Sequence, residues 1–81
     1  VLNSGFSRNI MSVIVDRLNW TDRIDAFIGS DEVPRGWPAA DMIKKMMAKY
    51  DIADSRAVAK VGDTPADIQE GLNAGCGLNI A

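Results

Sequence analysis

The amino-acid sequence predicts an α/β protein with a parallel sheet of about four strands and helices that cover its faces. Two observations support this fold class. Short apolar runs of strand length alternate along the chain with longer segments in which apolar residues recur at helical spacing. Glycine and proline residues fall between these segments, where the chain has to turn. Such an alternation places consecutive strands parallel in one sheet, joined by right-handed crossovers.

The first half of the chain contains two predicted strands and one predicted helix. Residues 1–4 begin with an apolar pair and are followed by Gly5, so we expect a strand that ends in a turn. Ser7 is a suitable N-cap for a helix whose apolar residues recur every three or four positions. These residues are Ile10, Met11, Ile14, Val15 and Leu18. A second apolar run at residues 24–28 is closed by a Gly-Ser-Asp turn and predicts the second strand.

The second half repeats this alternation after a loop at residues 31–38. Pro38 is expected in the first turn of a helix that runs to Tyr50, because proline is well tolerated at a helix start. Residues 57–61 predict the third strand, since they form an apolar run of strand length before a glycine.

A sharp turn at residues 62–65 leads from the third strand into the last helix. Thr64 is the expected N-cap and Pro65 the first helical residue, while Gly75 is expected to end the helix. The apolar residues of this helix are expected to face the sheet; they are Ala66, Ile68 and Leu72. Residues 78–81 predict the fourth strand.

The composition limits the size of the protein and its partners. Eighty-one residues, 47% hydrophobic and 25% charged, are typical of a single small domain, which we expect to span residues 1–81. A net charge of -2 without a basic cluster argues against a nucleic acid as partner, and the apolar runs are too short for a membrane span. Cys76 is the only cysteine, so a cytoplasmic location is expected. Because histidine is absent, acid–base chemistry has to use carboxylates.

Two acidic residues mark the turn that follows the third strand. Ligands of open parallel sheets collect at the carboxyl ends of the strands. Asp63 falls at such an end, and Asp67 falls in the first turn of the next helix. Two carboxylates held in this way suit Mg²⁺, which usually takes one or two carboxylates together with water and phosphate oxygens. The alternative is that both residues only complement the helix dipole and cap the turn.

Four further residues near the same edge are candidate phosphate ligands. Ser4 and Gly5 offer a hydroxyl and backbone N–H groups at the end of the first strand. Ordinary turn chemistry is the alternative explanation for this pair. Arg35 and Lys60 would supply the positive charge that a phosphate needs beside clustered carboxylates. The alternative for each of these two is simple solvation at the surface.

Together these residues resemble the haloacid dehalogenase (HAD) superfamily, and in particular its phosphonatase-like branch. The likeness covers nearly the whole chain and rests on three stretches, Leu-Asn-Ser-Gly-Phe at 2–6, Val-Gly-Asp-Thr-Pro-Ala-Asp at 61–67 and Glu-Gly-Leu-Asn-Ala-Gly at 70–75. It implies the C-terminal part of a Rossmann-like core domain. By the same likeness, Ser4 would hold a phosphoryl oxygen, and Asp63 and Asp67 would serve Mg²⁺. Members of the superfamily hydrolyse phosphate esters, and the phosphonatase branch cleaves the carbon–phosphorus bond of an aldehyde substrate.

The chain departs from the family pattern in two respects. In the family, a strand with an Asp-x-Asp motif comes first and supplies the nucleophilic aspartate, and nothing in these residues matches it. We therefore expect that the natural protein begins upstream of Val1 and that no catalytic nucleophile lies in this chain. The family also usually has Lys or Arg where this sequence has Trp37.

The unmatched strand has a geometric consequence. In the family it lies between the strands that correspond to residues 1–4 and 57–61, so the tips bearing Ser4 and Asp63 are expected roughly 10 Å apart. Either the two flanking strands pair with each other, or another segment fills the space, because unpaired buried backbone groups are costly.

Two functional hypotheses follow. The first is part of a magnesium-dependent hydrolase that acts on a small phosphate ester or phosphonate through an aspartyl-phosphate. The second is a non-catalytic binding or assembly module that forms a homodimer through exposed strand edges.

Overall fold

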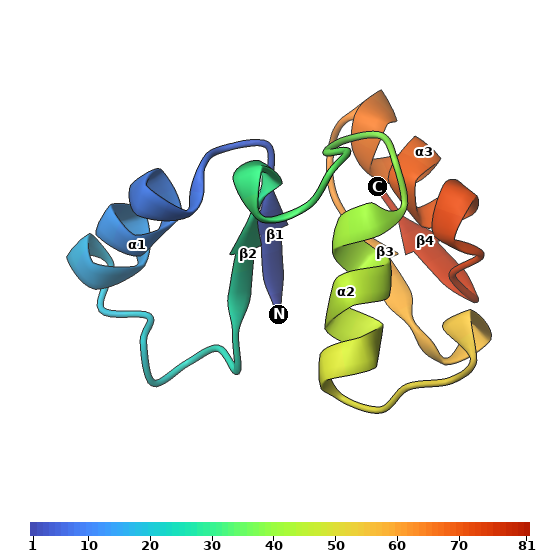
Figure 1. Ribbon diagram of the computed structural model, residues 1–81, viewed down its shortest axis with the longest axis horizontal. Coiled ribbons are helices and arrows are strands. Elements are labelled where there is room, and N and C mark those ends of the chain that lie inside the picture. The colour runs from blue at the N-terminus through green and yellow to red at the C-terminus, as the bar shows by residue number, and fades with distance from the viewer.

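The computed structural model describes residues 1–81 (Figure 1), in which strands and helices alternate. The strands are β1 (Leu2–Ser4), β2 (Phe27–Gly29), β3 (Ala59–Val61) and β4 (Leu78–Ile80), and the helices are α1 (Arg8–Arg17), α2 (Asp41–Lys49) and α3 (Pro65–Ala74). Short 3₁₀ turns occur at Ser30–Glu32 and Ser55–Ala57. This order confirms the predicted α/β class. None of the helices combines the length and apolar character needed to cross a membrane.

The four strands form two separate parallel pairs. In the first pair β1 lies beside β2 with Leu2 opposite Phe27, and in the second β3 lies beside β4 with Ala59 opposite Leu78. No backbone pairing joins β1 to β3. Figure 1 shows the two pairs side by side, with the strands directed toward the same upper edge. The predicted sheet is therefore divided between β1 and β3, where the family resemblance implies a further strand, and the two flanking strands do not pair with each other.

Helix α1 packs against the first strand pair. Its N-cap is Ser7, whose side chain accepts a hydrogen bond from the backbone N–H of Ile10, as predicted. Met11 and Val15 are almost completely buried on the inner face of the helix. With Ile28 of β2, which is 1% exposed, they form the core of this half.

Helix α2 connects the two halves, since it contacts both β2 and α3. Met42 and Ile43 are its buried residues, and Met42 is 0% exposed. The helix begins only at Asp41, so the prediction that Pro38 lies in its first turn is wrong. The reason is a separate turn before the helix, in which the N–H of Ala39 donates to the carbonyl of Gly36.

Helix α3 packs against the second strand pair and turns polar residues inward. Thr64 is its N-cap, Pro65 its first residue and Gly75 its left-handed C-cap at φ 75°, as predicted. Its buried residues are Asp67, Glu70, Gly71 and Ala74. The expectation that Leu72 faces the sheet is wrong, because this side chain is 58% exposed. The acidic residues take the inner face because the buried ammonium group of Lys60 in β3 lies opposite them.

Candidate functional site

The carboxyl ends of β1 and β3 meet the loop at residues 31–38 at one edge of the molecule. Figure 1 shows this loop arching from the first half to the second above the strand ends. Ser4 is the last residue of β1, where a turn begins, and the turn that contains Asp63 follows β3. The sequence-predicted residues of both turns therefore belong to the same edge of the fold.

The two predicted metal ligands differ in their surroundings. Asp63 is exposed, and its carboxylate takes part in none of the hydrogen bonds of the adjoining turn. Asp67 is 5% exposed and already has several donors. Its Oδ2 accepts hydrogen bonds from the Thr64 hydroxyl at 2.8 Å and from the Thr64 backbone N–H at 3.2 Å. The Nζ of Lys60 lies 3.4 Å from its Oδ1. Asp67 thus caps α3, which is the structural alternative that the sequence left open for it.

Gly62 permits this arrangement. A Cβ at position 62 would overlap with the carboxyl group of Asp67, so the side chain of Asp67 can lie against the turn only because glycine stands there. The close approach gives a physical reason for a glycine before the first aspartate of the motif at residues 62–67.

Hydrogen bonding keeps Asp67 ionised. Burial, the largest single influence, raises the pKa of its carboxyl group, but the hydrogen bonds from Thr64 and the charge of Lys60 together hold the pKa below its usual value. A carboxyl group with a lowered pKa stabilises the folded state above its pKa in the unfolded chain. This contribution is lost as the pH falls through the folded-state pKa.

We therefore expect the free energy of unfolding to fall as the pH is lowered from about 5 to 2, with Asp67 as one source of the decline. Asp67→Asn should lower stability at neutral pH and flatten the acid limb of the profile. Urea unfolding followed by circular dichroism at several pH values measures both effects. Asp16→Asn, at an exposed position on α1, is the matched control and should leave the profile unchanged. An unchanged acid limb in the Asp67 variant would contradict the assignment.

Ser4 and Gly5 form a turn that is closed by side chains. The Oγ of Ser4 accepts a hydrogen bond from the backbone N–H of Phe6 at 3.0 Å, which leaves its own proton free to donate. The carbonyl of Gly5 accepts from the hydroxyl of Ser30 at 2.7 Å. The turn chemistry considered from the sequence is thus present, and the Ser4 hydroxyl remains a possible donor to an anion.

The two predicted cations are both paired within the chain. Arg35 forms an exposed ion pair with Asp41 at 3.1 Å, and its own side chain is 77% exposed. Lys60 is 7% exposed, so the surface alternative does not hold for it. Its Nζ lies 3.0 Å from Glu70 and donates to Asn3 Oδ1 at 2.8 Å. Neither cation is free of acidic partners. The cluster that Lys60 forms with the carboxylates of Asp67 and Glu70 has one positive and two negative groups.

Glu70 and Trp37 belong to this site, although the sequence did not single them out as functional residues. Glu70 is 0% exposed, and both of its oxygens accept from Asn3 Nδ2 at 2.9 Å. Its Oε1 also accepts from Trp37 Nε1 at 2.6 Å. One carboxylate therefore links β1, β3, α3 and the loop at residues 31–38. The signal available in the sequence was the departure at Trp37, where the family resemblance implies a basic residue.

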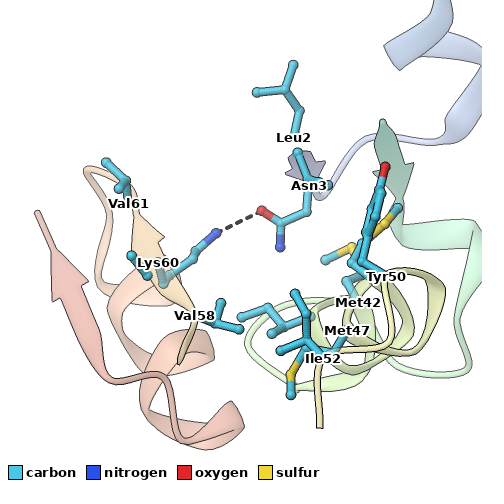
Figure 2. A pocket seen from close by; sticks show the side chains of 13 residues that line it. Leu2, Asn3, Met42, Met47, Tyr50, Ile52, Val58, Lys60 and Val61 are labelled. Atoms are coloured by element: carbon cyan, nitrogen blue, oxygen red, sulfur yellow. Dashed lines mark hydrogen bonds between the residues drawn. The ribbon is translucent and has the colours of Figure 1, made fainter. Parts of the chain in front are cut away.

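An apolar groove separates the two halves below this polar cluster. It has a volume of about 440 Å³, and 11 of its 13 lining residues are hydrophobic. The groove lies between β1 and β3 and is bounded by α2 and the segment that follows it. Figure 2 shows Leu2 and Asn3 on one side and Val58, Lys60 and Val61 on the other, with the hydrogen bond from Lys60 to Asn3 crossing between them.

The acidic residues of the site can be compared with what a magnesium ion requires. No group of three or more acidic, cysteine or histidine residues with a geometry suited to a metal occurs in the chain. Mg²⁺ usually needs only one or two carboxylates, since water and substrate phosphate complete its octahedron. The free carboxylate of Asp63 fits one such position, whereas the oxygens of Asp67 already have donors.

Comparison with known proteins gives one family. Residues 2–80 match the model of the haloacid dehalogenase-like hydrolases. Over 74 residues, or 90% of the chain, the sequence is 36% identical to a phosphonoacetaldehyde hydrolase of Syntrophobacter fumaroxidans, of which the match covers 27%. A phosphonoacetaldehyde hydrolase of Bacteroides fragilis is 38% identical over 88% of the chain and 27% of its own length. One of Latilactobacillus sakei is 45% identical over 63% of the chain and 19% of its own length.

The chain spans about a fifth to a quarter of the length of these relatives, whose matches cover 19% to 27%. The match extends over both strand pairs and all three helices, and the relatives support the phosphonatase-like branch inferred from the sequence motifs. On this evidence, the chain belongs to the haloacid dehalogenase-like hydrolases.

Proposed function

We propose that this chain forms the phosphate-binding and magnesium-binding part of a hydrolase that acts on a small phosphate ester or phosphonate. The observation that carries the proposal is the common edge of β1 and β3, to which the turns of Ser4 and Asp63 both belong. The similarity to phosphonoacetaldehyde hydrolases supports a phosphonate as one candidate substrate. The protein would work in the cytoplasm, where its unpaired Cys76 would stay reduced.

In this proposal the residues of the edge have different tasks. Asp63 would bind Mg²⁺ directly, and Asp67 would fix the turn that presents it through its hydrogen bonds to Thr64. The bound ion would offset the negative charge of the phosphoryl group. The hydroxyl of Ser4 and the backbone N–H of Ala66 at the start of α3 would bind phosphoryl oxygens, since a helix N-terminus favours anions and the N–H groups of Thr64 and Asp67 already donate within the cap. Because Arg35 and Lys60 are both paired with carboxylates, anion binding would depend strongly on the metal.

The nucleophile of the proposed reaction would be an aspartate outside these residues. Its carboxylate would attack phosphorus and expel the leaving group, and water would then hydrolyse the aspartyl-phosphate. The residues described here would hold the phosphoryl group in line for both steps.

Magnesium binding is the direct test of the proposed site. A ligand that binds only the folded state at ten times its Kd stabilises it by about 1.4 kcal/mol, so millimolar MgCl₂ should raise the thermal midpoint of the chain. Asp63→Asn should abolish this shift, whereas Asp16→Asn, at an exposed position on α1, should retain it. Calorimetry at matched ionic strength measures the midpoints. An equal magnesium shift in both variants would contradict a site at Asp63.

The chain by itself is not expected to hydrolyse phosphate esters. The proposed nucleophile is not among its residues, and positioning groups alone do not supply the covalent step. Incubation with p-nitrophenyl phosphate and Mg²⁺ should give the rate of the buffer alone. Turnover by the chain that disappears in Asp63→Ala would contradict this division of roles.

A non-catalytic assembly module is the second candidate, and the apolar groove favours it. The facing edges of β1 and β3 have no backbone partners across the groove, so a strand of a second copy could pair there. Light scattering would then show a mass that doubles with concentration, with no influence of Mg²⁺ on mass or stability. A constant monomer mass with magnesium-dependent stability favours the hydrolase.

A further inference from the structure

Trp37 lies between the turn after β1 and the side chain of Lys60 in β3. Cε3 of its ring is 3.1 Å from the position that a Cβ on Gly5 would occupy, so the ring packs against the turn after β1. On the other side, the Nζ of Lys60 in β3 lies 5.6 Å from the ring centroid. The indole therefore lies beside the turn that follows β1 and beside a side chain of β3, the two strands that flank the division of the sheet.

A buried carboxylate holds the indole in this place. Trp37 Nε1 donates to Glu70 Oε1 at 2.6 Å, and Glu70 is fully buried. The same carboxylate accepts from Asn3 at 2.9 Å and lies 3.0 Å from Lys60. Hydrogen bonds to an ionised acceptor are stronger than neutral ones, and a low local dielectric strengthens them further.

No backbone hydrogen bond sets the separation of β1 and β3. Side chains must do so, and at the carboxyl ends those side chains are Trp37, Asn3 and Lys60 around Glu70. A neutral indole donor satisfies Glu70 while its ring fills the space beside Gly5, which a flexible lysine would do less well.

We infer that Trp37 is a positioning residue, a wedge held by Glu70 that fixes the turn of Ser4 and Gly5 relative to the turn of Gly62 and Asp63. Only the use of those turns for phosphate and metal rests on the proposed function. The wedge itself is a statement about the geometry of this chain. In place of a cation at this loop position, the protein has a rigid ring anchored through one N–H group.

Nuclear magnetic resonance of the ¹⁵N-labelled chain tests the wedge. Its two tryptophan indole signals can be assigned with Trp37→Phe and Trp20→Phe. Trp37→Phe keeps an aromatic ring but removes the donor to Glu70, so it should shift the backbone amide signals of both Gly5 and Gly62. Trp20→Phe, at a partly exposed residue in another turn, should leave both signals in place. Unmoved Gly5 and Gly62 signals in Trp37→Phe would overturn the inference.

A double-mutant cycle separates anchoring from simple space filling. Trp37→Phe and Glu70→Gln should be coupled by about tenfold in the unfolding equilibrium constant, because both variants disrupt one charge-assisted hydrogen bond. Trp37→Phe and Glu32→Gln, which share no contact, should be additive. If the effects of Trp37→Phe and Glu70→Gln on the free energy of unfolding simply add, the ring only fills space and the anchoring by Glu70 is refuted. Where Glu70→Gln prevents folding, the amide shifts in Trp37→Phe decide the question.

The same variants keep the two proposals apart. If Mg²⁺ does not stabilise the wild-type chain but Trp37→Phe shifts the amide signals of Gly5 and Gly62, the proposed function is refuted and the positioning role of Trp37 stands. If Mg²⁺ binds through Asp63 but Trp37→Phe shifts neither glycine signal, the positioning role of Trp37 is refuted and the proposed function stands.

Discussion

Replacement of Lys60 by methionine is expected to leave the chain largely unfolded at room temperature. Its ammonium group is 7% exposed and lies 3.0 Å from Glu70 and 3.4 Å from Asp67. Removal of one partner of a buried ion pair typically costs about 3 to 5 kcal/mol, because a buried charge is left uncompensated. A chain of 81 residues has roughly 4 to 12 kcal/mol of stability in total, and the loss equals the whole of it at the lower end of this range. A small domain with a divided sheet is expected near that lower end.

Urea unfolding followed by circular dichroism measures this effect. Lys44→Met, at an exposed position of α2, is the matched control and should change the midpoint little, as surface substitutions usually do. Partial recovery is expected in the double variant Lys60→Met with Glu70→Gln, since it removes one of the two uncompensated charges. A Lys60→Met chain with the midpoint of the parent would show that the buried ion pairs are not formed in solution.

Gly71→Ala is expected to destabilise the chain by about 2 kcal/mol, although alanine is the better helix former. A Cβ at this position would overlap with the Oδ1 of Asn79 and would lie 2.9 Å from the Cβ of Lys60. Helix α3 would have to move away from β3 and β4. Because α3 also holds Glu70, the displacement would weaken the polar cluster as well as the packing.

The matched control lies one residue further along the same helix. Leu72 is 58% exposed, so Leu72→Ala should stay within about 0.5 kcal/mol of the parent. Thermal and urea unfolding of the two variants give the comparison. Gly71→Ala with unchanged or increased stability would mean that α3 is not in close contact with the sheet.

Local signals allowed much of the fold to be predicted from the sequence. Ser7, Thr64 and Gly75 act on residues within one helical turn, and the structure has each of them at the expected helix end. The same locality explains the error at Pro38. Proline is favoured at helix starts, but this preference does not show that a separate turn, closed by the hydrogen bond from Ala39 to Gly36, comes before the helix.

The polar cluster was harder to predict, because its contacts join residues that are far apart in the sequence. Asn3 and Glu70 are separated by 67 positions, and Trp37 and Glu70 by 33. The usual rule that apolar residues mark the inner face of a helix led to Leu72, whereas α3 turns Asp67 and Glu70 inward. Such a reversal requires a buried cation on the facing strand, and only the fold brings Lys60 to that place.

The divided sheet bears on how the molecule opens. Where strands pair continuously, the loss of one hydrogen bond is resisted by the whole ladder, but here β1 and β3 are tied by side chains alone. Segments with few shared contacts tend to open as separate cooperative units. The amide protons of Ile28 in β2 and of Gly62, which follows β3 and donates to the carbonyl of Ile80, should therefore exchange with deuterium through two distinct opening events. A further strand paired with both β1 and β3 would merge these events into one.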